Sequence, residues 1–206
     1  MSDANSERPW QVFSELAMEM LKQAHRGLRQ ATADAVRLID STSVRLSSLS
    51  ADWATFSTDV FGAKAHIVYD PHAGRPVYFA VTPANVNDIT AAKVMPVEPG
   101  TTYVYDLGYY DYGWWAQLDA AGCRFVTRLK KNTPFTAVHE SSVPKNRNIL
   151  SDRIGHLPAR LACSRNNPMH EPIREIQVVA DNGKVLRIVT NDLDAPVTEI
   201  ADLYKQ

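Results

Sequence analysis

The sequence predicts an α/β fold in which a mixed sheet is flanked by helices. Short apolar runs of strand length alternate with segments that have helical spacing. A Pro- and Gly-containing turn signal at residues 71–76 separates two apolar runs and indicates a hairpin. Two further apolar runs end in an acidic residue, one at Asp40 and the other at Asp106. Together these features favour one sheet-based domain that carries carboxylates on two of its strands.

The elements expected before residue 130 alternate along the chain. A helix is expected over residues 8–30, where Phe13, Leu16, Met20 and Ala24 form one stripe. Strands are expected at residues 36–39, 63–69, 77–81, 101–105 and 124–129, and helices at residues 86–94 and 110–121, the latter closed by Gly122. A hairpin, alternating helices and acidic residues on two strands are typical of a ribonuclease-H-like fold.

Beyond residue 130 the pattern changes to a β-rich insertion with long loops. Asp181-Asn182-Gly183 lies between two apolar runs and predicts a tight hairpin. A final helix begins at Pro196 and reaches the end of the sequence after about two turns. We therefore expect an N-terminal helix at 1–30, the first part of the core at 31–130, the β-rich insertion at 131–192 and the truncated start of the final core helix at 193–206.

Composition excludes several classes of protein. The chain has 206 residues, a formal net charge of −1 and two cysteines, Cys123 and Cys163, without metal-ligand spacing. A disulfide framework and a zinc knuckle are therefore not expected. No signal-peptide pattern and no apolar run of membrane-spanning length occurs. The sequence predicts a soluble, cytoplasmic protein that makes no contact with membranes.

The near-neutral net charge hides a basic segment at residues 124–165. This segment has nine basic residues and two acidic ones, Glu140 and Asp152. The basic residues are Arg124, Arg128, Lys130, Lys131, Lys145, Arg147, Arg153, Arg160 and Arg165. Such a surplus can form a phosphate-binding surface, but it can also be a solvated loop region, and both interpretations stay open.

The two strand-end aspartates are the candidate catalytic residues. Carboxylate oxygens are the ligands that hard divalent cations prefer, and two of them on neighbouring strands could hold a metal pair for phosphodiester chemistry. Each aspartate also has an ordinary structural role open to it, because Asp40 precedes Ser41-Thr42 and Asp106 precedes Leu107-Gly108, where either could cap a turn.

Several short motifs give the chain a family resemblance. They are Leu38-Ile39-Asp40-Ser41-Thr42, Lys64-Ala65-His66 with Asp70, Val86-Asn87-Asp88, Tyr105-Asp106-Leu107-Gly108-Tyr109, Gly122 with residues 125–130, and residues 189–191 through 203–206. In this order they resemble the DDE transposases of bacterial insertion sequences, in the group typified by insertion sequence four. The resemblance covers most of the chain.

The resemblance implies a site in which three carboxylates bind two Mg²⁺ or Mn²⁺ ions. Asp40 would be the first carboxylate and Asp106 the second. The third would be a glutamate in a Tyr-x-x-Arg-x-x-x-Glu motif, in which Tyr204 matches the tyrosine and the glutamate position falls beyond Gln206. Glu199 lies twelve residues before that position, about 18 Å along a helix, so substitution by Glu199 is not expected.

The resemblance also implies partners and an activity. The partners are DNA, at the terminal inverted repeats of a transposon, and further copies of the same protein. Candidate DNA contacts are Lys64, Lys130, Lys131, Arg147 and Arg153. We expect a fragment truncated at both ends that lacks the third carboxylate and is inactive alone.

Two other functions stay open at this point, and four residues keep two roles. The chain could be a non-catalytic DNA-binding remnant that interferes with full-length transposase, or an unrelated cytoplasmic enzyme with incidental aspartates. His66 could approach DNA or be a buried structural residue, and Asp88 could cap a helix or bind metal. Trp114 and Trp115 could stack on a flipped base or belong to the core.

Overall fold

The computed structural model describes residues 10–25, 35–47, 54–57, 60–144, 148–161 and 165–205. The chain divides into two compact units, Met1–Met95 and Pro96–Gln206. Each unit has its own strands and its own buried side chains. Within the described ranges, no helix combines the length and apolarity needed to cross a bilayer.

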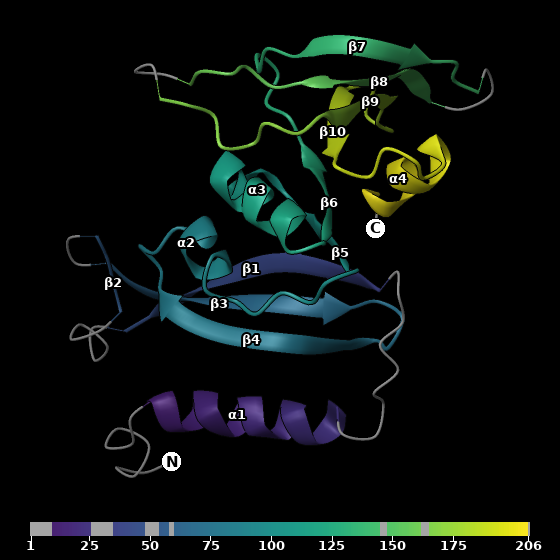
Figure 1. Ribbon diagram of the computed structural model, residues 1–206. Coiled ribbons are helices and arrows are strands. Elements are labelled where there is room, and N and C mark those ends of the chain that lie inside the picture. The colour runs from purple at the N-terminus through teal and green to yellow at the C-terminus, as the bar shows by residue number, and fades with distance from the viewer. Residues whose placement is uncertain are drawn as a thin grey trace. The chain divides into compact units, whose positions relative to one another are not determined.

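The first unit is a sheet centred on one long hairpin. Its elements are α1 (Trp10–His25), β1 (Val36–Leu46), β2 (Thr55–Ser57), β3 (Val60–Asp70), β4 (Arg75–Pro83) and α2 (Asp88–Ala92). Strand β3 pairs antiparallel with β1, β4 and β2. Helix α1 lies along β4 (Figure 1). Ile39 of β1 and Val68 of β3 are buried in this unit.

Strand β1 is longer than the sequence indicated, and this changes the position of Asp40. The sequence predicts a strand over residues 36–39 with Asp40 at its end. Instead, β1 pairs with β3 from Leu38, opposite Tyr69, to Leu46, opposite Phe61. Because this ladder satisfies the backbone of the polar run at residues 41–43, the strand continues through it. Asp40 therefore lies inside β1, and the prediction that it ends a strand is wrong.

The helices of the first unit also differ from expectation in detail. Helix α1 forms within the predicted range, but Leu16 and Met20 of the expected stripe are exposed. The side chains of Phe13 and Ala24 lie outside the described residues. Helix α2 is shorter than predicted, since it begins only at Asp88 after Asn87 and ends at Ala92.

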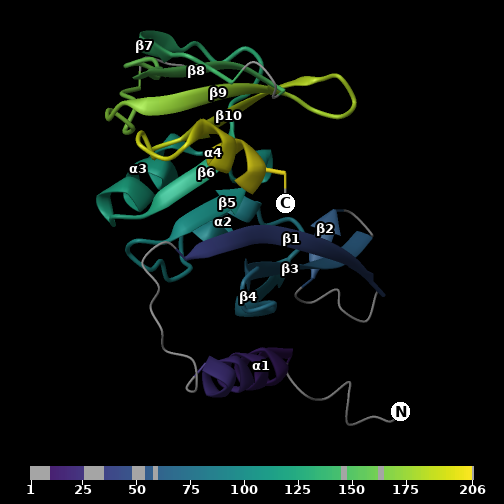
Figure 2. The same ribbon diagram turned by 90° about the vertical axis from the view of Figure 1, so that its right-hand side faces the viewer.

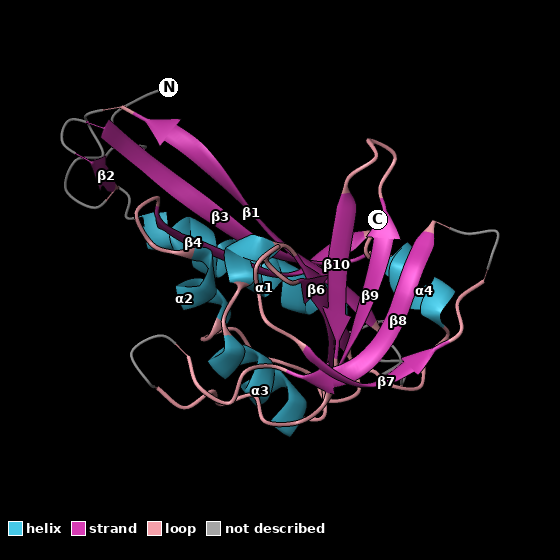
Figure 3. Ribbon diagram, turned by 90° about the horizontal axis from the view of Figure 1, so that it is seen from above, coloured by secondary structure: helices cyan, strands magenta, loops and turns pink. Residues whose placement is uncertain are grey.

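The second unit is one sheet with two helices packed on it. Its elements are β5 (Thr102–Tyr105), the 3₁₀ helix η3 (Leu107–Tyr109), α3 (Tyr112–Ala120), β6 (Arg124–Arg128), β7 (Thr136–Ser141), β8 (Ile149–His156), β9 (Ile173–Val179), β10 (Val185–Thr190) and α4 (Val197–Leu203). The strand order is β5-β6-β10-β9-β8-β7. Strands β5 and β6 are parallel, and the other neighbouring strands are antiparallel. Figure 3 shows β6, β10, β9, β8 and β7 side by side.

The predicted β-rich insertion is continuous with the sheet of the second unit. Strand β10 pairs with β6 on one side and with β9 on the other. Gly183 has φ of 74° in the β9–β10 turn, which explains why the Asn-Gly pair marks this hairpin. Helix α3 packs on β6, and Figure 2 shows α4 lying against β9. The buried core includes Trp115, Phe125 and Ile188.

Candidate active site

Asp40 lies on β1 in the first unit and is exposed. Its Oδ1 accepts a hydrogen bond from the backbone N–H of Ser41 at 2.7 Å. In the described part of the chain no cation is paired with this carboxylate, although Arg37 of the same strand forms an ion pair with Asp70 at 2.9 Å. The Asp40 carboxylate thus keeps acceptor capacity for a ligand.

Asp106 follows β5 directly in the second unit, as predicted. All four residues of β5 are buried, whereas Asp106 itself is exposed. Its Oδ1 accepts a hydrogen bond from the N–H of Gly108 at 2.8 Å and so caps η3. The capping role considered for Asp106 is therefore real, but it uses one carboxylate oxygen and leaves the other exposed to ligands.

A tyrosine and an arginine gather near Asp106 within the second unit. Tyr204 follows α4, and the Arg128 guanidinium carbon of β6 lies 5.5 Å from the centre of its ring. Burial raises the pKa of Tyr204, the nearby charge of Arg128 opposes this rise, and the charge of Asp106 adds to it. The end of α4 is therefore within electrostatic reach of Asp106. The sequence singled out Tyr204 only through the family motif and did not single out Arg128.

The chemistry of both aspartates fits a hard divalent cation. Among the described residues, neither carboxylate has a cation partner, and a backbone amide donates to one oxygen of each. Among the described residues no group of three or more His, Cys, Asp and Glu side chains could hold a metal ion. Asp40 belongs to the first unit and Asp106 to the second, so their meeting at one ion stays a prediction.

The basic residues predicted to contact DNA have different surroundings. Lys130 and Lys131 are exposed, and the Lys130 Nζ lies 4.6 Å from the centre of the Tyr110 ring. Lys64 forms an ion pair with Asp88 at 2.9 Å in the first unit. Arg153 is paired with buried Glu175, and Arg147 lies outside the described residues.

Arg187 fixes the loop that presents the two exposed lysines. Its Nη1 donates to the backbone oxygens of Lys130 at 3.1 Å, Lys131 at 3.0 Å and Thr133 at 2.8 Å. Its Nε binds Glu175, which is fully buried. One guanidinium thus holds three carbonyls in place, which the sequence could not reveal because Arg187 lies more than fifty residues away.

Four residues had two possible roles each, and the structure assigns three of them to the core while Asp88 takes a different role. Trp114 and Trp115 are both buried, at 2% and 0% exposure, so both belong to the core. Asp88 does not cap α2, since Asn87 occupies the N-cap position, and its carboxylate instead binds Lys64 and Ser41. His66 is 4% exposed and therefore matches the structural interpretation.

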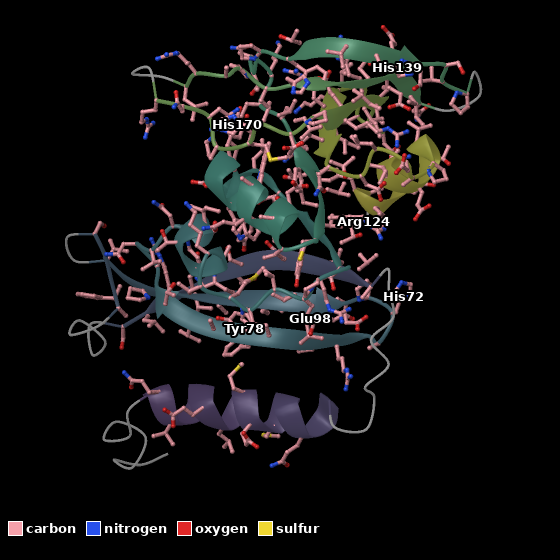
Figure 4. The ribbon with its side chains drawn as sticks, viewed as in Figure 1. His72, Tyr78, Glu98, Arg124, His139 and His170 are labelled. Carbon is pink, nitrogen blue, oxygen red and sulfur yellow. The ribbon has the colours of Figure 1, made fainter. Side chains whose placement is uncertain are left out.

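The β-rich part of the second unit carries exposed polar groups. His139 projects from the edge strand β7, whose side chains are mostly exposed (Figure 4). Arg124, also labelled in Figure 4, lies at the start of β6 and forms an ion pair with Asp192 at 3.5 Å. Arg124 is therefore paired with a neighbouring carboxylate, whereas His139 faces solvent.

Comparison with known proteins places these observations in a family. Residues 31–206 match the family described as the transposase DDE domain. The chain is 35% identical to y4zB of Sinorhizobium fredii, described as a transposase, and covers 57% of it. It is 23% identical to a protein of Geobacillus stearothermophilus, described as a transposase for insertion sequence element IS5377, and covers 54% of it. Both matches use 100% of this chain.

A solved structure shares the fold. The chain superimposes on piggyBac transposase, solved as a synaptic complex with hairpin DNA, with a TM-score of 0.55 at 10% sequence identity. The match covers 98% of this chain and 42% of that protein. It confirms the predicted ribonuclease-H-like fold.

The chain spans about half the length of the curated relatives it matches. The interpretation as an unrelated enzyme is wrong, because residues 31–206 match the transposase DDE domain. The catalytic roles of Asp40 and Asp106 stay predictions. The match over residues 31–206 shows that the chain belongs to the transposase DDE domain family.

Proposed function

We propose that this chain contributes to DNA transposition by metal-dependent phosphodiester cleavage and strand transfer, with Asp40 and Asp106 as two ligands of a two-metal site. The observation that carries the proposal lies within the second unit. There, strand β6 contacts both residues: the Thr127 hydroxyl donates to the backbone oxygen of Asp106 at 3.4 Å, and the Arg128 guanidinium carbon lies 5.5 Å from the ring centre of Tyr204, which matches the tyrosine of the family motif. In the family this tyrosine begins the motif that carries the third carboxylate, so its approach to the second carboxylate supports the assignment.

The residues of the chain would hold and orient the site. The amide of Ser41 fixes one oxygen of Asp40, and the amide of Gly108 fixes one oxygen of Asp106. A fixed carboxylate binds a cation without first losing rotamer freedom. Bound Mg²⁺ or Mn²⁺ ions would activate the attacking water or 3′-hydroxyl and stabilise the leaving oxygen.

The loop of Lys130 and Lys131 is the part of the basic segment best suited to DNA. Both side chains are exposed, and Arg187 holds the backbone that carries them. A pre-ordered loop loses little entropy when a phosphate binds it. We propose contacts to transposon ends through these lysines, with Arg153, Lys64 and Arg147 as further candidates. We also propose assembly of several copies on DNA and action in the cytoplasm.

Metal binding tests the catalytic assignment. The measurement is Mn²⁺ binding by electron paramagnetic resonance, which reports directly on the two proposed ligands. Asp40→Asn and Asp106→Asn should each weaken binding at least tenfold. The matched control is Asp181→Asn, an exposed aspartate in the β9–β10 turn. Unchanged Mn²⁺ binding in both site variants would overturn the assignment.

Salt dependence tests the DNA surface. Lys130→Ala and Lys131→Ala should each weaken binding to DNA of the transposon ends and lower the slope of log affinity against log salt by about 1. Lys184→Ala, an exposed lysine beside the β9–β10 turn, is the control. DNA binding that persists with no measurable Mn²⁺ binding would favour the second candidate function, a non-catalytic DNA-binding remnant that interferes with full-length transposase.

A further inference from the structure

Ser41 connects two carboxylates in the first unit. Its backbone N–H donates to Asp40 Oδ1 at 2.7 Å, and its Oγ donates to Asp88 Oδ1 at 2.8 Å. Because successive side chains of a strand point to opposite faces, Asp40 and Ser41 project from opposite faces of β1. The contact between Ser41 and Asp88 is therefore on the face of β1 opposite the Asp40 side chain, which is exposed.

Asp88 is itself held from more than one direction. Lys64 of β3 places its Nζ 2.9 Å from Asp88 Oδ1 and donates to the backbone oxygen of Val86 at 2.9 Å. The side chains of Lys64 and Asp88 are 14% and 22% exposed, so solvent screens the pair only in part. Asn87, and not Asp88, is the N-cap of α2. The carboxylate of Asp88 is thus committed to β1 and β3 and does not cap its own helix.

A buried histidine, His66, lies next to the Lys64–Asp88 ion pair. His66 is opposite Ser41 in the β1–β3 register, and its Nε2 lies 2.9 Å from the hydroxyl of Thr82. Its Nδ1 lies 3.9 Å from Asp88 Oδ1 and has no hydrogen-bond partner among the described residues. Burial lowers the pKa of His66, although the charge of Asp88 opposes this effect. The nearer cation to the Asp88 carboxylate is Lys64, whose Nζ lies 2.9 Å away against 3.9 Å for His66 Nδ1.

We propose that Ser41 and Asp88 are positioning residues that orient Asp40 for metal binding. Asp88, anchored by Lys64, fixes the hydroxyl of Ser41, and this contact fixes the peptide whose N–H holds Asp40 Oδ1. The backbone segment at residues 40 and 41 is then locked between two carboxylates. This inference rests on the proposed function of Asp40.

The physical consequence is a contribution to metal affinity without contact to the metal. Groups that orient a metal ligand typically change metal affinity by about 10- to 100-fold when they are removed. Without the Oγ contact, the peptide of Ser41 can rotate, and the carboxylate of Asp40 has to be ordered again when the ion binds. Ser41 and Asp88 would thus act through Asp40.

The experiment measures Mn²⁺ dissociation constants of the full chain by electron paramagnetic resonance. Ser41→Ala and Asp88→Asn should each raise the constant by about 10- to 100-fold. Ser41→Thr keeps a hydroxyl and should restore the wild-type constant. Ser43→Ala is the matched control, because Ser43 projects from the same face of β1 and is exposed. Far-UV circular dichroism and the thermal midpoint of each variant show whether it has folded.

A second measurement needs no metal. Amide hydrogen exchange at residues 40 and 41 should become faster in Ser41→Ala and Asp88→Asn and stay unchanged in Ser43→Ala. The variant Asp40→Asn distinguishes the positioning role of Ser41 and Asp88 from the proposed role of Asp40 as a metal ligand. If it abolishes Mn²⁺ binding while Ser41→Ala and Asp88→Asn bind like wild type, the positioning role is refuted and the proposed function stands. If Asp40→Asn binds Mn²⁺ like wild type, both are refuted.

Discussion

Replacing Arg174 should destabilise the second unit more than any surface substitution. Its Nε and Nη2 donate to the two carboxylate oxygens of Asp152, each at 2.7 Å. Arg174 and Asp152 are 6% and 3% exposed. Its Nη1 also donates to the backbone oxygen of Ala195 at 2.5 Å and to that of Leu193 at 3.4 Å. One side chain therefore joins β8 and β9 to the loop that leads into α4.

The expected loss follows from these contacts. In Arg174→Met the carboxylate of Asp152 stays buried without its partner, which typically costs about 3–5 kcal/mol. The carbonyls of Leu193 and Ala195 also lose a donor, and each adds up to about 1 kcal/mol where water cannot replace it. We expect a decrease of about 4 kcal/mol in the free energy of unfolding, a large fraction of the roughly 5–15 kcal/mol typical of folded proteins.

Urea unfolding followed by tryptophan fluorescence measures this loss, because Trp114 and Trp115 are buried in the second unit. The double variant Asp152→Leu/Arg174→Met should recover most of the lost stability, since it removes both charges. A loss below about 1 kcal/mol in the single variant, or a double variant as unstable as the single one, would refute the reasoning.

Three further predictions concern other parts of the chain. Because burial lowers the pKa of His66 in the folded state, the free energy of unfolding should fall as pH decreases below about 6.5, and His66→Gln should reduce this dependence in pH-dependent urea titrations. Gly155→Ala should cost about 1–3 kcal/mol or more in urea unfolding, because the new Cβ would clash with the backbone oxygen of Thr136, whereas Gly183→Ala meets no atom within 4 Å and should cost about 1 kcal/mol through its positive φ. Burial raises the pKa of the Cys123 thiol, so its reaction with a disulfide reagent should be slow in the native protein and fast in urea, and equal rates would contradict this.

Local signals in the sequence predicted much of the fold. The Asn-Gly turn predicted the β9–β10 hairpin, and residues 71–74 form the turn between β3 and β4. Gly122, with φ of 70°, follows the end of α3 as expected. In each case the turn depends on the residue types within it, so a short window of sequence contains the information needed.

Features that depend on distant partners could not be predicted in this way. The extension of β1 through its polar run needs the full length of β3 beside it. The pairing of Arg174 with Asp152 joins residues 22 positions apart. The residues on either side of each give no sign that its charge is buried. For Asp88, the helix-start pattern indicated a cap, whereas Lys64 and Ser41 bind its carboxylate in the folded unit.

The candidate site was predicted through the family resemblance more than through local pattern. The apolar run before Asp106 correctly predicted that Asp106 follows a buried strand. The same prediction for Asp40 was wrong, because Asp40 lies within β1. Arg128 was noted only as one charge in the basic segment, although its guanidinium lies against the ring of Tyr204. Such a contact between β6 and the end of α4 depends on tertiary packing and has no signature in the sequence near Arg128.

The central claim is that Asp40 and Asp106 bind the same metal pair. Its most direct test loads the chain with Fe²⁺ in place of Mg²⁺ and adds ascorbate and peroxide, so that radicals formed at the bound iron cut the nearby backbone. The account predicts cuts in both β1 and the segment from β5 to η3, and the loss of both sets in either Asp40→Asn or Asp106→Asn. Cuts in one segment only, or cuts that persist in both variants, would contradict it.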